Sequence, residues 1–151
     1  MKTFSSIDEI LDFAMNEEQQ AVEFYTRLAE QANTPDMRQI FEEFANEEIG
    51  HKAKLAKIKE EGSYSAPFEN IADLKIADFT ASVEVKPDMT YQEALVVAMK
   101  KEKAAFKLYT VLAERAPNEE MRSLFLTLAQ EESKHKLRFE LEYDEHVLRE
   151  N

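Results

Sequence analysis

The sequence contains no cysteine, only two glycines and four prolines, and far fewer basic than acidic side chains. Without cysteine, the chain has no disulfides, zinc knuckles, cysteine-ligated iron–sulfur clusters or thiol nucleophile. A formal charge of −12 argues against binding to nucleic acid, whose phosphates would repel it. No apolar run approaches the ~20 residues of a membrane span, so we expect no membrane association. The N-terminus lacks the basic and apolar layout of a signal peptide, and we therefore expect a cytoplasmic protein.

The scarce helix breakers divide a chain that is otherwise patterned as helix. Apolar residues recur at alternating steps of three and four, which is typical of one buried face along an amphipathic helix. Thr34 followed by Pro35 is a typical helix start, and Gly62 is a typical stop. The pattern predicts helices over about 6–32, 34–61, 90–116 and 118–147.

Residues 62–89 interrupt this pattern between two prolines, Pro67 and Pro87. A short helix is predicted around Ile71 to Phe79, but the segment as a whole reads as a long crossover. A helix of ~27 residues is ~40 Å long, and the segment is long enough to return the chain over that distance. We predict one domain over residues 1–151, made of a hairpin at 6–61, a crossover at 62–89 and a second hairpin at 90–147.

The two predicted hairpins are copies of each other. Aligning residues 6–52 with 90–136 gives 20 identities, which indicates an internal duplication. Two such hairpins predict an all-α protein, a four-helix bundle with pseudo-twofold symmetry.

The duplication preserves three polar residues on the apolar faces of each half, and each residue of the first half recurs 84 positions later. They are Glu18, Glu48 and His51 in the first half and Glu102, Glu132 and His135 in the second. Four buried carboxylates are costly unless cations compensate them, and two divalent ions supply +4 against −4. Carboxylate with imidazole suits iron or manganese and also accepts zinc. Ala21 and Ala105, one turn beyond Glu18 and Glu102, leave room for metals and a small oxidant.

Several other residues are expected to play no part in this site. Glu47 and Glu131 lie ~100° around their helices from the apolar face, so we expect them in solvent and dispensable. We expect Gly50 to meet a local packing need, His146 to lie on the surface, and the phenylalanines to form the core.

A glutamate on each of two helices, with Glu-x-x-His on each of the other two, resembles the di-iron site of ferritin-like proteins. The segments EEQQAVEFYTRLAE, KEKAAFKLYTVLAE and DLKIADF are similar to the rubrerythrin family in particular. The resemblance implies a ferritin-like bundle with two irons per chain, held by the six residues above, which would also be the catalytic residues. It further implies that Tyr25 and Tyr109 hydrogen-bond to ligand carboxylates.

Two features depart from that family. Rubrerythrins append a cysteine-ligated rubredoxin domain, which this chain lacks, and they carry an extra glutamate at the position of Ala105. The resemblance therefore implies a more symmetric site, and electrons supplied by a separate rubredoxin-like donor protein.

The expected activity is that of a di-iron peroxidase, which reduces hydrogen peroxide or dioxygen. We expect a role in oxidative stress, and a homodimer as the active form. The alternative is an iron-binding or ferroxidase module without sustained turnover. A metal-dependent sensor that uses the crossover surface is a third reading.

Overall fold

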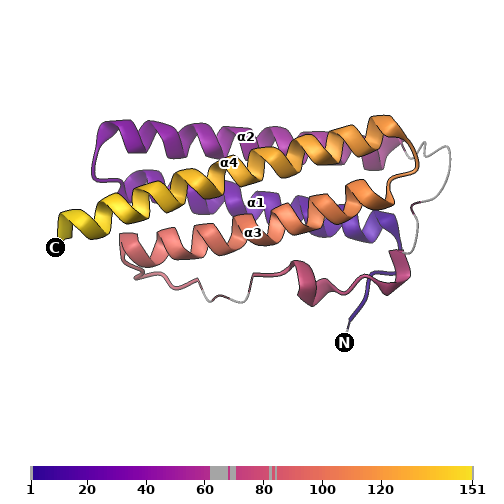
Figure 1. The fold of residues 1–151 in the computed structure, drawn as a ribbon, viewed down its shortest axis with the longest axis horizontal. Coiled ribbons are helices and arrows are strands. Elements are labelled where there is room, and N and C mark those ends of the chain that lie inside the picture. The colour runs from indigo at the N-terminus through magenta and orange to yellow at the C-terminus, as the bar shows by residue number, and fades with distance from the viewer. Residues whose placement is uncertain (1, 62–67, 69–70, 82, 84, 151) are drawn as a thin grey trace.

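The computed structural model describes residues 2–61, 68, 71–81, 83 and 85–150, and four long helices dominate it. They lie side by side along the length of the molecule (Figure 1). Their bounds are Ile7–Gln31 for α1, Pro35–Glu61 for α2, Tyr91–Arg115 for α3 and Glu119–Glu150 for α4. The predicted four-helix bundle is confirmed, and α4 extends three residues beyond its predicted end at Val147.

Side-chain caps fix where the helices begin. The Ser6 hydroxyl accepts a hydrogen bond from the backbone N–H of Glu9, and Thr90 forms a complete capping box with Glu93. The Asn118 side chain caps α4 in the same way, 2.9 Å from the backbone nitrogen of Met121. Such caps satisfy backbone N–H groups that have no partner within the helix. The local sequence therefore determines each helix start to within one residue of its prediction.

The pairing of the helices follows the duplication. α1 packs along α2, and α3 along α4, whereas α1 and α3 approach each other only locally. Between the hairpins, residues 71–81 lie along the outside of the bundle, and α3 begins at the end where α1 finishes (Figure 1). This arrangement is the lengthwise crossover that the sequence predicted.

The crossover contains two short 3-10 helices instead of the single predicted helix. They are η1 (Ile71–Asp73) and η2 (Ile76–Phe79). The N-terminal segment interrupts them: the Phe4 N–H donates to the Leu74 carbonyl at 3.1 Å, and the Ile76 N–H donates to the Lys2 carbonyl at 3.2 Å. Because these backbone groups bond to another segment, a continuous helix cannot use them. Gly62 and Pro67 lie outside the described residues.

The interior consists of two apolar clusters with a polar layer between them. One cluster includes Leu11, Leu55 and Phe125, and the other includes Leu28, Phe41 and Phe139. The polar layer holds the six glutamates and histidines that the duplication preserved, all of them buried. The expectation that the phenylalanines are core is wrong for Phe106, whose surface is 42% exposed. Among the described residues, no helix is long and apolar enough to cross a membrane.

Candidate metal centre

The six predicted residues come together at mid-bundle, one or two from each helix. α1 contributes Glu18 and α3 contributes Glu102, while α2 and α4 each contribute a glutamate and, one turn later, a histidine. Each residue is at most 2% exposed: Glu18, Glu48, His51, Glu102, Glu132 and His135. The spacing of three residues places the glutamate and histidine of a pair on one side of their helix.

Their ligand atoms form two overlapping groups. One group is made by Glu18, Glu48, His51 and Glu132, and the other by Glu48, Glu102, Glu132 and His135. Within each group one ligand atom per residue lies within 4.8 Å of all the others. Glu48 and Glu132 belong to both groups, which is the arrangement expected if their carboxylates lie between two neighbouring ions.

Each residue of these groups has one potential ligand atom that is buried and makes no hydrogen bond among the described residues. They are Oε2 of Glu18 and Glu102, Oε1 of Glu48 and Glu132, and Nδ1 of His51 and His135. Some lie close together, such as Nδ1 of His51 and Oε1 of Glu132 at 2.9 Å, but their orientation does not make a hydrogen bond. Buried polar atoms without partners are costly and rare. Six of them converging from four helices fit a site built for cations.

The other nitrogen of each imidazole contacts a glutamate on the opposite hairpin. Nε2 of His135 lies 2.5 Å from Oε2 of Glu47, and Nε2 of His51 contacts Oε2 of Glu131 in the same way. A carboxylate at Nε2 holds the proton there and directs Nδ1 towards the ligand group. Each imidazole is thereby oriented by the neighbouring helix.

These two glutamates were missed by the sequence analysis. Glu47 is indeed exposed, at 52%, but Glu131 is only 33% exposed, and both contact a histidine. The expectation that they are merely solvated is therefore wrong. A signal for their role was present, since Glu47 and Glu131 also recur 84 residues apart.

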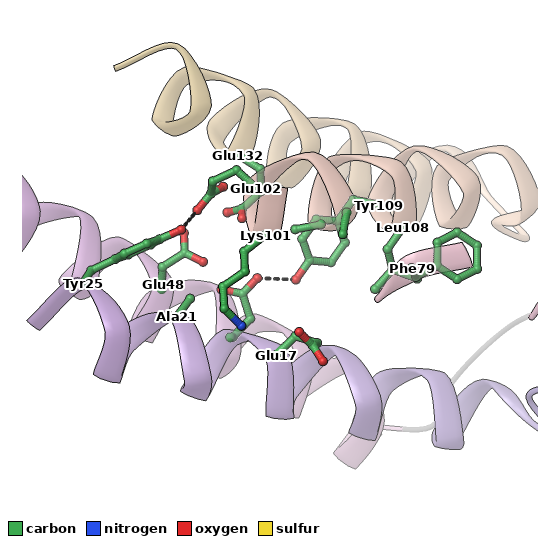
Figure 2. Close-up of a pocket in the computed structure, with 13 residues that line it drawn as sticks. Glu17, Ala21, Tyr25, Glu48, Phe79, Lys101, Glu102, Leu108, Tyr109 and Glu132 are labelled. Carbon is green, nitrogen blue, oxygen red and sulfur yellow. Dashed lines mark hydrogen bonds between the residues drawn. The ribbon is translucent and has the colours of Figure 1, made fainter. Parts of the chain in front are cut away.

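The two predicted tyrosine contacts are present and cross between the hairpins. The Tyr25 hydroxyl on α1 donates to Glu102 on α3, and the Tyr109 hydroxyl on α3 donates to Glu18 on α1 (Figure 2). Both rings are at most 1% exposed. Each tyrosine thus binds Oε1 of the glutamate in the other half. Oε2 of both glutamates stays free of hydrogen bonds among the described residues and is available to the ligand groups.

The enclosed carboxyl groups bind protons more tightly than glutamates in water. Burial raises the pKa of Glu18 to about 8 and that of Glu48 to about 7, and the neighbouring carboxylates add to both shifts. Burial and the charges of Glu102 and Glu18 raise the pKa of Glu132 well above its usual range. Without cations, the site therefore retains protons at neutral pH.

The histidines respond in the opposite way to burial. Burial lowers the pKa of His51, but the carboxylates of Glu132, Glu18 and Glu48 outweigh it and raise the pKa to about 11. In the same way, the carboxylates of Glu102 and Glu48 outweigh burial and raise the pKa of His135 to about 12. A cation that binds at Nδ1 must displace these protons, so binding of a metal is linked to proton release.

A small cavity of about 20 Å³ lies against the ligand carboxylates, between α1 and α3. This is room for roughly one water molecule, and hydrogen peroxide and dioxygen are only slightly larger. Ala21 and Ala105 line it, as the sequence predicted, and so do the half-buried residues Glu17 and Lys101 (Figure 2). Burial raises the pKa of Glu17, and the nearby Lys101 ammonium partly offsets this.

Two other expectations do not hold. A Cβ built on Gly50 would meet nothing within 4 Å, so no packing contact requires glycine there. His146 is half-buried and not on the open surface: its ring packs edge-on against Tyr91 with centroids 5.2 Å apart, and its Nδ1 lies 3.3 Å from Nδ2 of Asn33. The register of α4 against the start of α3 creates this contact.

The fold is a four-helix bundle that buries a carboxylate–histidine cluster with the composition of a site for two cations. The structure is similar to that of a Thermotoga maritima protein provisionally assigned as a ferritin-like diiron-carboxylate protein, with a TM-score of 0.76 and 21% sequence identity over 97% of this chain and 99% of that one. It is also similar to a hypothetical protein from Pyrococcus furiosus, with a TM-score of 0.72 and 26% identity over 93% of this chain and 89% of that one.

The family model for rubrerythrin matches residues 9–143. The chain therefore belongs to the rubrerythrin family, and the match includes most of both hairpins and all six candidate ligands. No curated protein sequence matches the chain.

Proposed function

We propose that this protein holds two iron ions and uses them to reduce hydrogen peroxide, or dioxygen, with electrons from a separate donor. The observation that carries the proposal is the pair of ligand groups that share Glu48 and Glu132. Membership of the rubrerythrin family supports iron as the metal. Manganese and zinc suit the same ligands, and we treat them as alternatives for loading.

Each ligand group has the composition that such an ion requires. Three carboxylates and one imidazole surround each position, and the four glutamates together balance the charge of two divalent cations. Bound iron would supply a Lewis acid and two electrons per pair of ions for the reduction of the oxidant. We infer that Glu48 and Glu132 would contribute to holding both ions, while Glu18 with His51 and Glu102 with His135 would each complete one group.

The remaining residues of the site act on geometry and access. Tyr25 and Tyr109 fix the carboxylates of Glu102 and Glu18, so these ligands do not need to reorient when an ion arrives. Glu47 fixes the ring of His135 in the same sense. The cavity has room for roughly one water molecule, so its size favours small oxidants over bulky ones.

The electrons must come from outside this chain. Reduction of peroxide to two waters consumes two electrons and two protons. One pair of ferrous ions would supply the two electrons once, and the protons come from water. The sequence has no cysteine to hold an iron–sulfur or rubredoxin-type centre. We therefore propose a separate rubredoxin-like protein as donor, acting on a cytoplasmic homodimer.

The near-symmetric ligand set supports one alternative, a ferroxidase without sustained turnover. Each half of the duplication contributes the same two glutamates and one histidine, and Ala105 occupies the position where rubrerythrins carry an additional glutamate. A site of this kind would oxidise ferrous ions with dioxygen and pass the product on.

The test is an anaerobic single-turnover reaction. Protein loaded with two ferrous ions per chain is mixed with hydrogen peroxide, and peroxide loss and iron oxidation are followed together. We expect one peroxide consumed per chain, and repeated turnover only after a reduced rubredoxin-type donor is added. A reaction that is much faster with dioxygen than with peroxide would favour the ferroxidase. Many turnovers without a donor would contradict both and indicate a catalase-like disproportionation of peroxide.

A further inference from the structure

Two charged, partly exposed residues line the cavity at the metal centre, one on α1 and one on α3. Glu17 on α1 and Lys101 on α3 are half-buried and line the cavity together with the ligand carboxylates. Lys101 extends from α3 towards α1, the helix that carries Glu17 (Figure 2). Each immediately precedes a candidate ligand, Glu18 or Glu102, so their backbone positions are fixed by the site itself.

These two positions break the symmetry of the duplication. Where both members of a duplicated pair line the cavity, the residue is otherwise the same in both halves, as the pairs 18 and 102, 21 and 105, 25 and 109, and 48 and 132 show. Positions 17 and 101 are the exception, with an acid in one half and a base in the other. Two carboxylates at these positions would make the opening strongly anionic. A carboxylate opposite an ammonium group instead allows the two side chains to attract each other across it.

A packed element of the crossover also contributes to the wall of the cavity. Phe79 of η2 also lines the cavity, is 3% exposed, and has the Lys107 ammonium 5.8 Å from its ring centroid. Lys101, in contrast, has space to move. It borders a neighbouring surface hollow of about 250 Å³, formed with Gln20, Arg27 and others. A lysine side chain can turn on its flexible stem between the two spaces.

We propose that Glu17 and Lys101 form a charge gate across the opening between α1 and α3, through which metal ions reach the ligand carboxylates. This inference rests on the proposed function of the site as a metal centre. With Lys101 turned towards Glu17 the ammonium group blocks and repels an incoming cation. With Lys101 turned into the neighbouring hollow, the Glu17 carboxylate faces the open path.

The experiment measures how fast cobalt(II), used alone as a redox-stable probe, enters and leaves the full-length protein. Uptake is followed by stopped-flow absorbance, and release by transfer to excess chelator. The variants are Glu17→Gln and Lys101→Met, which keep side-chain size, together with the charge-swapped double variant E17K/K101E. Lys103→Met is the matched control, because it removes the same charge one residue beyond Glu102, at an exposed position that does not line the cavity.

A gate and a simple electrostatic effect predict different signs. If the pair is a gate, each single variant speeds both uptake and release, by about two- to fivefold, and the double variant returns both rates towards the original values. If only the local charge matters, Lys101→Met speeds uptake and slows release, while Glu17→Gln does the reverse. Lys103→Met should leave both rates nearly unchanged.

The outcomes separate this proposal from the proposed function. Rates that are unchanged, or that move in opposite directions, with two cobalt ions still bound per chain would overturn the gate and leave the metal centre intact. Failure of the unaltered protein to bind cobalt at all would overturn the proposed function. Equal cobalt stoichiometry in every variant shows that the substitutions have not unfolded the protein.

Discussion

The Tyr25 hydroxyl on α1 donates a hydrogen bond to the carboxylate of Glu102 on α3, 77 residues further along the chain. Its duplicate, Tyr109, makes the reciprocal bond to Glu18. The contacts join the two hairpins at the level of the metal centre, where α1 and α3 otherwise approach only locally. The site is therefore assembled by the docking of two hairpins and not within either one.

Replacing Tyr25 or Tyr109 with phenylalanine should lower the stability of the protein, and by a similar amount for the two tyrosines. Tyr25→Phe and Tyr109→Phe each leave a buried carboxylate with one hydrogen bond fewer, at a cost of about 1–3 kcal/mol in the free energy of unfolding. The measurement is chemical denaturation of the metal-free protein. Tyr143→Phe, which removes a half-buried hydroxyl outside the site, should change it much less. A large effect from one site tyrosine and none from the other would contradict the reciprocal arrangement.

Glu47 and Glu131, which contact the histidines, should affect metal affinity although both are partly exposed to solvent. Glu47→Ala and Glu131→Ala each remove the acceptor that orients an imidazole, and loss of such a contact typically lowers metal affinity about 10- to 100-fold. Glu47→Ala should weaken the group that contains His135, and Glu131→Ala the group that contains His51.

The readout for these two variants is metal titration, with one class of site weakened and the other retained. Glu43→Ala, which removes the same charge one turn earlier at an exposed position on α2, is the control and should leave both classes intact. If Glu47→Ala binds metal as tightly as Glu43→Ala, the contact with His135 has no functional weight.

The metal-free protein should become less stable as pH rises through neutrality. The pKa of Glu48 is about 7 and that of Glu18 about 8 when folded, above the usual 4.5, and those of His51 and His135 are raised to about 11 and 12. A group whose pKa is raised by folding stabilises the fold below its unfolded pKa and loses that contribution as pH climbs to the folded value. Stability should thus fall from about pH 4.5 to 8 through the glutamates, and further above neutrality through the histidines.

The check is a series of melting curves on chelator-treated protein between pH 5 and 8. The shift of Glu48 alone corresponds to about 3 kcal/mol by pH 8. Glu48→Gln removes that titration and should flatten the curve and raise stability at pH 8. A melting temperature that climbs steadily from pH 5 to 8 would refute this account of the buried carboxyl groups.

What the sequence predicted well depended on periodicity within single helices. The apolar face through Leu11, Glu18 and Tyr25 is predicted from the period of 3.6 residues per turn and from one buried face alone. The structure buries all three residues. The duplication then supplied the second half by symmetry. Helix starts were predicted because capping depends on neighbouring residues, as at Thr90 and Glu93.

What the sequence missed depended on which elements become neighbours. Glu47 meets His135 only because α2 lies beside α4, and the periodicity of one helix contains no information about that. His146 meets Tyr91 for the same kind of reason, since the register of α4 against α3 sets it. The crossover divides into two 3-10 helices because the backbone of Lys2 and Phe4 bonds to it, a contact across some 70 residues of sequence.

The most direct test of the account is the number of ferrous ions that one chain binds under anaerobic conditions, measured by titration and elemental analysis. The two overlapping ligand groups predict two ions per chain. Because Glu48 and Glu132 belong to both groups, Glu48→Ala and Glu132→Ala should each weaken both positions, whereas Glu18→Ala should weaken chiefly one. Two ions in the unaltered protein with this pattern of loss would bear out the site. One ion or none, in protein with its helices intact, would contradict it.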